Sequence, residues 1–428
     1  MKLPNPLQAL RRLRLRTSPA GLTRTQRANY FYTQMDAAGV GLTMAVDPFV
    51  AVFLARLGAS NQQIGLFNAI PGFAGLSLAL VMGRFLQTRR SIVPWYSAAR
   101  FVRLATYGVM GLAALLLPPE YTVVAVLGVW LLASVPQTLL NVAFSVLMNA
   151  IAGPRGRYAL LSRRWSTIGV VGAVMTVVVG QVLDRIRFPL NYQLTLMGFA
   201  FLGATTSFLF ARRIDVPAGT PLPTHAPSGP VWSRLRAYGG WIWAEQRPFV
   251  AFVAKRVVYT AGSYIVLPLY ALYYVRELQA SDVQISIITT VQKALLMIGY
   301  FVWPRLRQSR GSRFILLSTT LALSLYPAFT AMTRHVAVMT VLVGIAAIFQ
   351  AGINLVFFDE LMQTVPDDQS ATFVSISQSV ENLLAVVGPI FSTSIAGVIG
   401  LGGALLLGAG FRLAGFALFL FSRHGQQA

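Results

Sequence analysis

The sequence contains no cysteine and few charged residues. Without cysteine, thiol catalysis and thiolate metal sites are excluded, while the redox compartment stays open. Only three histidines are present, two of them in predicted loops, which disfavours a metal enzyme. Charged residues make up 11% of the chain, whereas ordinary globular domains carry roughly 25%.

Apolar residues dominate instead: they form 55% of the 428 residues, and the mean hydropathy is +0.63. A soluble protein of this composition would have to hide more apolar surface than a sphere can bury, whereas lipid removes that problem. A helix needs about 20 residues to cross the hydrocarbon core. Apolar segments of that order run roughly over 28–54, 62–83, 92–117, 121–150, 165–183, 190–210, 248–275, 283–303, 314–333, 336–358, 371–396 and 402–421. The sequence predicts an all-α integral membrane protein with twelve transmembrane helices.

Basic residues are distributed unevenly, and their distribution predicts the topology. The net charge is +22, but the basic residues lie in short clusters between the apolar runs, which argues against a nucleic-acid partner. With the N-terminus inside, the predicted cytoplasmic segments hold 25 Lys and Arg and the outer loops hold 5. By the positive-inside rule, we expect a multi-pass protein of a bacterial inner (plasma) membrane with both termini in the cytoplasm.

One long hydrophilic stretch, residues 212–247, has five prolines and no apolar period, so it is interpreted as a cytoplasmic linker. The expected organisation is a basic cytoplasmic arm over 1–27 that contacts anionic lipid, a six-helix bundle over 28–211, the linker over 212–247, a second six-helix bundle over 248–421, and a tail over 422–428. The apolar stretch after the arm is too long for a signal peptide.

The two halves are related in sequence. Ala59-Ser60-Asn61-Gln62-Gln63-Ile64 matches Ala280-Ser281-Asp282-Val283-Gln284-Ile285 at an offset of 221 residues. Gln137-x-x-x-Asn141-x-x-Phe144 matches Gln350-x-x-x-Asn354-x-x-Phe357 at an offset of 213. One match enters the second helix and the other lies in the fourth helix of each half. Both together indicate duplication of a six-helix unit.

Two six-helix halves, a basic central loop and a duplicated loop after the second helix resemble the major facilitator superfamily over about residues 28–421. The firmest pieces are Leu57-Gly58-Ala59-Ser60-x-x-Gln63-Ile64-Gly65 and Arg155-Gly156-Arg157. The family's loop motif Gly-x-x-x-Asp-Arg-x-Gly-Arg is degenerate here, because Gln87 stands where Asp is expected. The resemblance implies a central cavity between the halves and transport by alternating access.

Lys293 and Glu381 lie midway along the eighth and eleventh predicted helices, at matching depths. Charged groups in lipid are costly, so they usually face a cavity or a partner. One interpretation is a substrate or proton site in which Glu381 accepts a proton; the other is a structural ion pair. Asn382, next to Glu381, is a further candidate cavity residue.

Two amide pairs, Gln137/Asn141 and Gln350/Asn354, are spaced i, i+4, so each pair points to one helix face. Their depth and symmetry suggest two polar patches that bind a substrate by hydrogen bonds. The alternative is that they hold neighbouring helices together, at roughly 0.6 to 2 kcal/mol for each bond.

Asp36 lies inside the first predicted helix. It is a candidate cavity residue that carries protons. The alternative is a fixed partner for Arg256, Arg100 or Arg103.

The cytoplasmic end of the fourth helix is basic (Arg155, Arg157, Arg163 and Arg164), and the end of the tenth helix is acidic (Asp359, Glu360, Asp367 and Asp368). Arg155 and Arg157 are expected to meet Asp359 and Glu360 as an ionic gate when the inner side closes. Exposed ion pairs contribute only about 0.2 to 1 kcal/mol each, which suits a gate that must open. The alternative is ordinary solvated loop charge.

The predicted function is secondary active transport of a small organic solute, with proton coupling left open. The protein is expected to be a monomer, and no enzyme activity, metal or cofactor is expected. The sequence contains no Walker A motif, which disfavours ATP-driven transport. The main alternative is a membrane assembly factor or sensor that kept the fold without transporting. An intramembrane enzyme is a weaker alternative, because no nucleophile accompanies Lys293 and Glu381.

Overall fold

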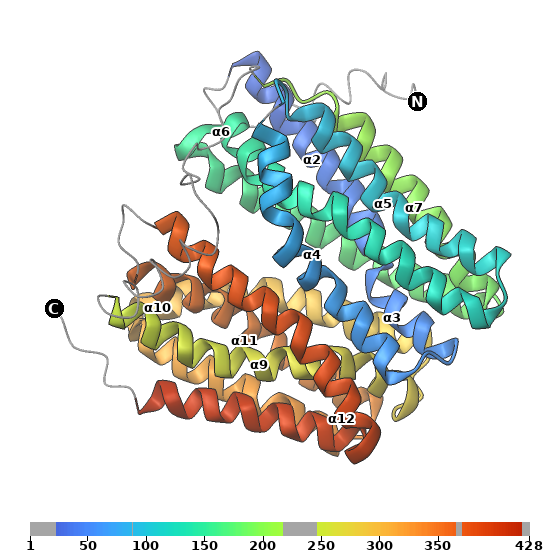
Figure 1. The fold of residues 1–428 in the computed structure, drawn as a ribbon, viewed down its shortest axis with the longest axis vertical. Coiled ribbons are helices and arrows are strands. Elements are labelled where there is room, and N and C mark those ends of the chain that lie inside the picture. The colour runs from blue at the N-terminus through green and yellow to red at the C-terminus, as the bar shows by residue number, and fades with distance from the viewer. Residues whose placement is uncertain (1–22, 88, 217–245, 365–369, 422–428) are drawn as a thin grey trace, which may run out of the picture. The chain divides into compact units, whose positions relative to one another are not determined.

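A computed structural model describes residues 23–87, 89–216, 246–364 and 370–421. The predicted arm and tail, and most of the predicted linker, lie outside these ranges. Within them the regular elements are all helices: α2 (Arg24–Met44), α3 (Asp47–Arg56), α4 (Asn61–Gln87), α5 (Val93–Leu116), α6 (Pro119–Arg185), α7 (Leu190–Ala211), α9 (Arg247–Arg276), α10 (Asp282–Met332), α11 (Val336–Gln363) and α12 (Ser370–Leu420) (Figure 1).

The exposed surface of these helices is largely apolar. Side chains such as Leu132, Phe201, Met332 and Val398 are between 70% and 85% exposed. Water would penalise such a surface, whereas hydrocarbon does not. Nine stretches in the described residues are long and apolar enough to cross a membrane. The prediction of an all-α integral membrane protein is therefore confirmed.

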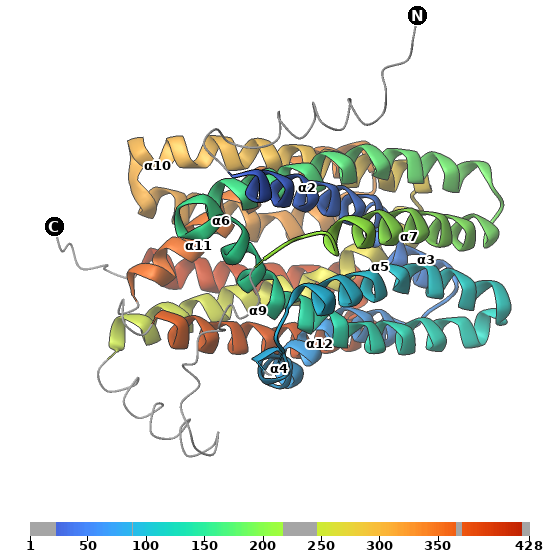
Figure 2. The ribbon, with the colours of Figure 1, turned by 90° about the horizontal axis from the view of Figure 1, so that it is seen from above.

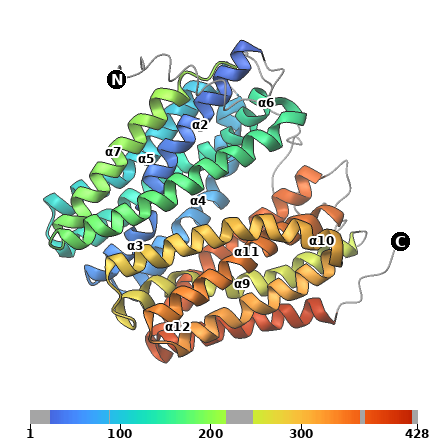
Figure 3. The same ribbon diagram turned by 180° about the vertical axis from the view of Figure 1, so that it is seen from behind.

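Three helices are much longer than one membrane crossing. α6 has 67 residues, and α10 and α12 have 51 each, where about 20 are enough. α10 and α12 each contain a glycine with positive φ, Gly311 at 78° and Gly400 at 76°. Glycine adopts this conformation without steric cost, so the helix can turn back there. Figure 1 shows the two arms of α12, Figure 3 shows those of α10, and α6 turns back near its label in Figure 2. The count of twelve crossings stays a prediction.

The chain divides into two compact units. One contains Met1–Val50 and Ser77–Thr224, and the other contains Ala51–Leu76 and His225–Ala428. The sequence assigns residues 28–211 to one bundle, whereas residues 51–76, which include most of α3 and the first half of α4, group with the second unit.

In the first unit, α2 and α7 cross with their backbones in contact. A Cβ added to Gly39 would lie 2.6 Å from the Ser207 amide nitrogen and 2.7 Å from the Gly203 carbonyl oxygen. Only glycine leaves room for this approach, as in other small-residue crossings of membrane helices. Toward the N-terminal end of α2, buried apolar side chains of α2, α5, α6 and α7 form a core that includes Tyr30 and Tyr96.

The second unit repeats this arrangement. α9 crosses α12 at Gly262, where an added Cβ would lie 2.7 Å from the Gly408 carbonyl oxygen. Its core is a cluster of aromatic and aliphatic side chains from α9, α10, α11 and α12, including Phe252, Phe357 and Phe419. The first and last helices of each half thus meet at a glycine pair, in agreement with the duplication read from the sequence.

Candidate functional site

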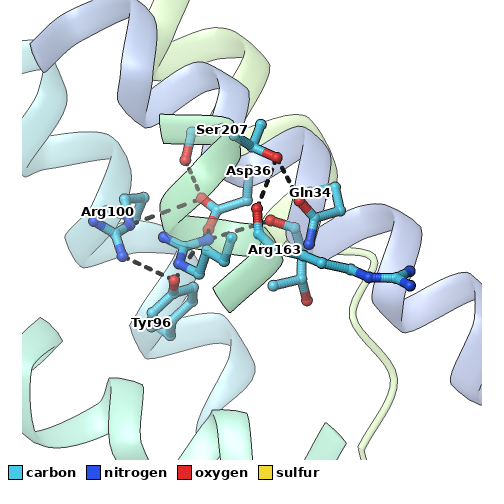
Figure 4. A network of polar contacts seen from close by, with 9 residues as sticks. Gln34, Asp36, Tyr96, Arg100, Arg163 and Ser207 are labelled. Atoms are coloured by element: carbon cyan, nitrogen blue, oxygen red, sulfur yellow. Dashed lines mark hydrogen bonds and ion pairs between the residues drawn. The ribbon is translucent and has the colours of Figure 1, made fainter. Parts of the chain in front are cut away.

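Asp36 on α2 lies at the centre of a buried polar network in the first unit (Figure 4). Its Oδ2 is 2.6 Å from Nη1 of Arg164 on α6 and accepts a hydrogen bond of 3.1 Å from the Tyr96 hydroxyl. Its Oδ1 accepts a hydrogen bond from Ser207 on α7 and lies 3.8 Å from Nε of Arg100 on α5. Four helices therefore meet at one carboxylate.

The network is enclosed by its own bundle. Asp36 has no exposed surface, and the Arg164 side chain is 2% exposed. A buried charge is tolerated only when it is paired and hydrogen-bonded. The Asp36 carboxylate has both an opposite charge beside it and hydrogen-bond donors. Its position is that of a fixed ion pair inside the unit, and it does not line an open face. Of the predicted partners, the structure brings Arg100 close. The closest partner, Arg164, was placed by the sequence in the basic end near the gate.

Glu381 on α12 forms its ion pair with Arg256 on α9. Arg256 also donates to the Ser377 hydroxyl over 3.2 Å. The two charged side chains remain 17% and 21% exposed, so this pair is only partly buried. Glu381 thus has an ion-pair partner on α9, the helix that packs most closely along α12. The roles predicted for Glu381 and Lys293, a substrate or proton site or a structural ion pair, stay predictions. Lys293 is half-buried on α10.

The two predicted amide pairs have matching geometry. Gln137 donates from Nε2 to Oδ1 of Asn141 over 2.7 Å, and Gln350 donates to Asn354 over 2.9 Å. In both pairs the glutamine is half-buried and the asparagine is exposed.

The exposed asparagines lie on helix faces that also carry exposed apolar side chains. Successive helical residues are rotated by about 100°, so Asn141 lies about 120° around α6 from the exposed Val135. Asn354 lies about 180° around α11 from the exposed Ile345 and about 40° from the exposed Phe358. Each unit therefore has one hydrogen-bonded amide pair with an exposed asparagine in the middle of a long apolar helix.

Asn382 is used in helix packing. A Cβ added to Gly72 on α4 would lie 2.9 Å from the Asn382 carbonyl oxygen, and one added to Gly75 would lie 3.0 Å from its Nδ2. The residue is half-buried against this glycine face of α4.

The acidic end of α11 is bound within its own unit. Asp359 lies 2.6 Å from Nη2 of Arg307 on α10, and the Ser312 hydroxyl donates to Glu360 over 2.7 Å. The side chains of Arg155 and Arg157 lie outside the described residues. The cross-half gate stays a prediction.

The duplicated loop motif has a structural cause that the sequence comparison did not identify. Ser60 and Gln63 form a reciprocal capping box at the start of α4, and Ser281 and Gln284 form the same box at the start of α10. Each box satisfies backbone N–H groups that have no partner in the first turn. The Ser-x-x-Gln spacing is a readable signal for such a cap.

The two capped loops also bind each other, and both lie in the second unit. Arg56 lies 2.9 Å from Oδ1 of Asp282 and donates to the Ala280 carbonyl oxygen over 3.0 Å. Arg276 donates to Oδ1 of Asn61 over 2.6 Å and to the Ala59 carbonyl oxygen over 2.7 Å. The arginine before each loop thus binds the other loop in the same way, at an alanine carbonyl and at the first residue of the following helix. We call these contacts the reciprocal clasp.

Solved structures with the same fold are transporters. A variant of the nucleoside transporter NupG superposes with a TM-score of 0.71 at 14% identity, covering 92% of this chain and 100% of that chain. A bacterial homologue of the iron transporter ferroportin, in an inward-facing state, gives 0.69 at 14% identity, with 94% and 98% coverage. A bacterial homologue of the human lysosomal transporter Spinster gives 0.62 at 14% identity, with 94% and 95% coverage. The chain therefore shares the fold of these multi-pass membrane proteins.

The sequence comparison names the family. Residues 256–427 match the family model described as Major Facilitator Superfamily. No curated protein matches the chain in sequence. The resemblance to this superfamily is thereby confirmed, in fold over most of the chain and in sequence over its second half.

Proposed function

We propose that this protein is a secondary active transporter that moves a small organic solute across a bacterial inner membrane by alternating access. The observation that carries the proposal is the pair of exposed amides, Asn141 and Asn354, at equivalent places in duplicated apolar helices. Exposed polar groups within membrane helices are unfavourable in lipid, so they favour a water-filled cavity. Substrate sites of such transporters lie between repeats near the midplane.

Glu381 is the better candidate for proton coupling. Its side chain is 21% exposed, whereas Asp36 has no exposed surface. Lys293 is proposed as the second charged residue of the substrate or proton site in the second bundle, together with Glu381. Arg155 and Arg157 with Asp359 and Glu360 are proposed as the cytoplasmic gate, with both termini on that side. The protein is proposed to act as a monomer.

A thermal-shift screen of purified protein against a metabolite and drug library tests the proposal. A ligand that stabilises the wild type is expected to lose its effect in an Asn141→Ala, Asn354→Ala double variant, because both proposed cavity amides are removed. Gln181→Ala, which changes an exposed amide near the end of α6, is the control and should keep the effect. Gradient-driven uptake of the same ligand into proteoliposomes then separates transport from binding.

The alternative is a membrane assembly factor or sensor that does not transport. An absence of any ligand, together with an absence of flux and unaltered stability of the double variant, would favour it over the proposed transporter.

The reciprocal clasp provides a test of alternating access. Arg56→Gln with Arg276→Gln removes the one ion pair of the clasp and the hydrogen bonds that the two arginines donate. A partly exposed ion pair contributes about 0.2 to 1 kcal/mol, and a hydrogen bond about 0.5 to 1.5 kcal/mol. We expect a cysteine placed at Asn354 to react up to about tenfold faster with a membrane-impermeant thiol reagent added outside. The natural lack of cysteine removes background labelling. The control is Arg334→Gln, an exposed arginine before α11. Equal labelling in both variants would mean that the clasp does not hold the outer side closed.

A further inference from the structure

The orientation of the amides in the first polar patch is determined by an arginine. Nε of Arg103 on α5 donates to Oε1 of Gln137 over 3.0 Å. A guanidinium can only donate, so the oxygen of Gln137 must face Arg103 and its nitrogen must face away. That nitrogen donates to Oδ1 of Asn141, and the Nδ2 group of Asn141 is consequently left on the exposed side.

Most of the hydrogen-bonding groups left over in this patch are donors. The oxygens of Gln137 and Asn141 each accept one hydrogen bond and keep a second lone pair, whereas the second N–H of Gln137 and both N–H groups of Asn141 are left to donate. Nη1 of Arg103 is shielded from solvent and has no hydrogen-bond partner among the described residues, so the guanidinium contributes charge beside these donors. A ligand group that satisfies the amide donors must be an acceptor.

The patch is also positively charged. Arg103 has no carboxylate within ion-pair distance among the described residues. Its Nη2 donates to the Tyr107 hydroxyl over 3.3 Å, and that hydroxyl in turn donates to Asp47. The guanidinium carbon lies 4.3 Å from the Trp130 ring centroid, so an aromatic face provides part of its compensation.

The equivalent patch in the second unit is different. Asn354 donates from Nδ2 to the Tyr300 hydroxyl over 3.0 Å, and Oε1 of Gln350 is left as an acceptor. Among the residues that the structure describes, no arginine donates to this pair, so it offers both donors and acceptors. The duplicated amides have therefore diverged, and the difference lies in Arg103.

We propose that Arg103, Gln137 and Asn141 form a binding site for an anionic group, a carboxylate or a phosphate, of the transported solute. The inference rests on the proposed function and assigns its substrate class: organic anions. Charge-assisted hydrogen bonds to such groups are roughly twice as strong as neutral ones.

The test uses matched probe pairs that differ only in charge. Nicotinate is compared with nicotinamide, succinate with succinamide, and phenyl phosphate with phenol, by thermal shift of the full-length protein, with inorganic phosphate alongside. We expect an anionic member to stabilise the wild type more than its neutral partner. Asn141→Asp is expected to weaken that anion's binding about 10- to 100-fold, because it replaces the donor group with a carboxylate.

The control is Gln181→Glu, the same amide-to-acid change at an exposed position near the end of α6, which should leave anion binding within a few-fold of wild type. Asn141→Ala is a second variant that removes the donor without adding charge, in case Asn141→Asp does not fold. Loss of anion binding in Gln181→Glu equal to that in Asn141→Asp would overturn the proposal, as would equal effects of the neutral partners.

An anionic lipid headgroup presents the same chemistry. The assay is therefore repeated in phosphatidylcholine vesicles with and without phosphatidylglycerol. Stabilisation by phosphatidylglycerol alone, removed by Asn141→Asp, would assign the patch to lipid and overturn the substrate assignment. Uptake of a neutral solute without any anion binding would reject the anion site while the transporter function stands. An absence of flux for every solute would reject the function itself.

Discussion

An Asp36→Asn variant is expected to unfold at a temperature on the order of 10 °C below the wild type. The change leaves Arg164 buried at 2% exposure without its carboxylate. Removing one partner of a buried ion pair typically costs about 3–5 kcal/mol, because the other charge stays desolvated. Melting temperature and monodispersity in detergent measure the effect.

Two further variants locate the cause. Asp184→Asn changes an exposed acid at the end of α6 and should melt like the wild type. Combining Asp36→Leu with Arg164→Met removes both charges and should recover much of the loss, since buried pairs can often be replaced by apolar residues. If Asp36→Asn instead melts normally but loses proton-coupled transport, Asp36 is a proton carrier, as the sequence left open.

A second large effect is expected at the crossing of α2 and α7. Gly39→Ala places a methyl group 2.6 Å from a backbone nitrogen and 2.7 Å from a backbone oxygen, neither of which can rotate away. The helices must separate, which also moves Ser207 away from Asp36. We expect a loss of several kcal/mol, comparable with overpacking elsewhere, or no stable protein.

The matched control is Gly198→Ala on α7, where nothing lies within 4 Å of the added methyl group. Alanine is the better helix former by about 1 kcal/mol, so this variant should be as stable as the wild type or more so. Opposite signs at the two glycines are the expected result. Equal melting temperatures would mean that the crossing is not close-packed.

Hydropathy and charge bias predicted the architecture because lipid imposes one-dimensional rules: length, apolarity and the placement of arginine. The duplication was visible because Ser60 and Gln63, like Ser281 and Gln284, cap helices that begin in the same way. A helix cap depends on residues only three positions apart, so its spacing can be recognised in the sequence.

Side-chain partners were harder to predict, because they depend on which helices are neighbours. Lys293 and Glu381 share a depth, and Glu381 has its ion pair with Arg256 because α9 packs along α12. Arg164 was placed by sequence in a basic cytoplasmic cluster, but helix rotation turns it inward toward Asp36. The depth of a residue in the membrane can be estimated by counting along its helix. The direction in which its side chain points, and which helix lies beside it, depend on how the helices pack.

The Asp36 network also bears on how the protein is made. Arg164 follows Asp36 by 128 residues, and Ser207 follows it by 171. At about 5–20 residues per second, the ribosome needs roughly ten seconds to supply the missing cation. During that interval α2 carries an acid that hydrocarbon disfavours by about 2.5–3.5 kcal/mol. α2 therefore obtains the closest partners of its buried acid only after α6 and α7 have been synthesised.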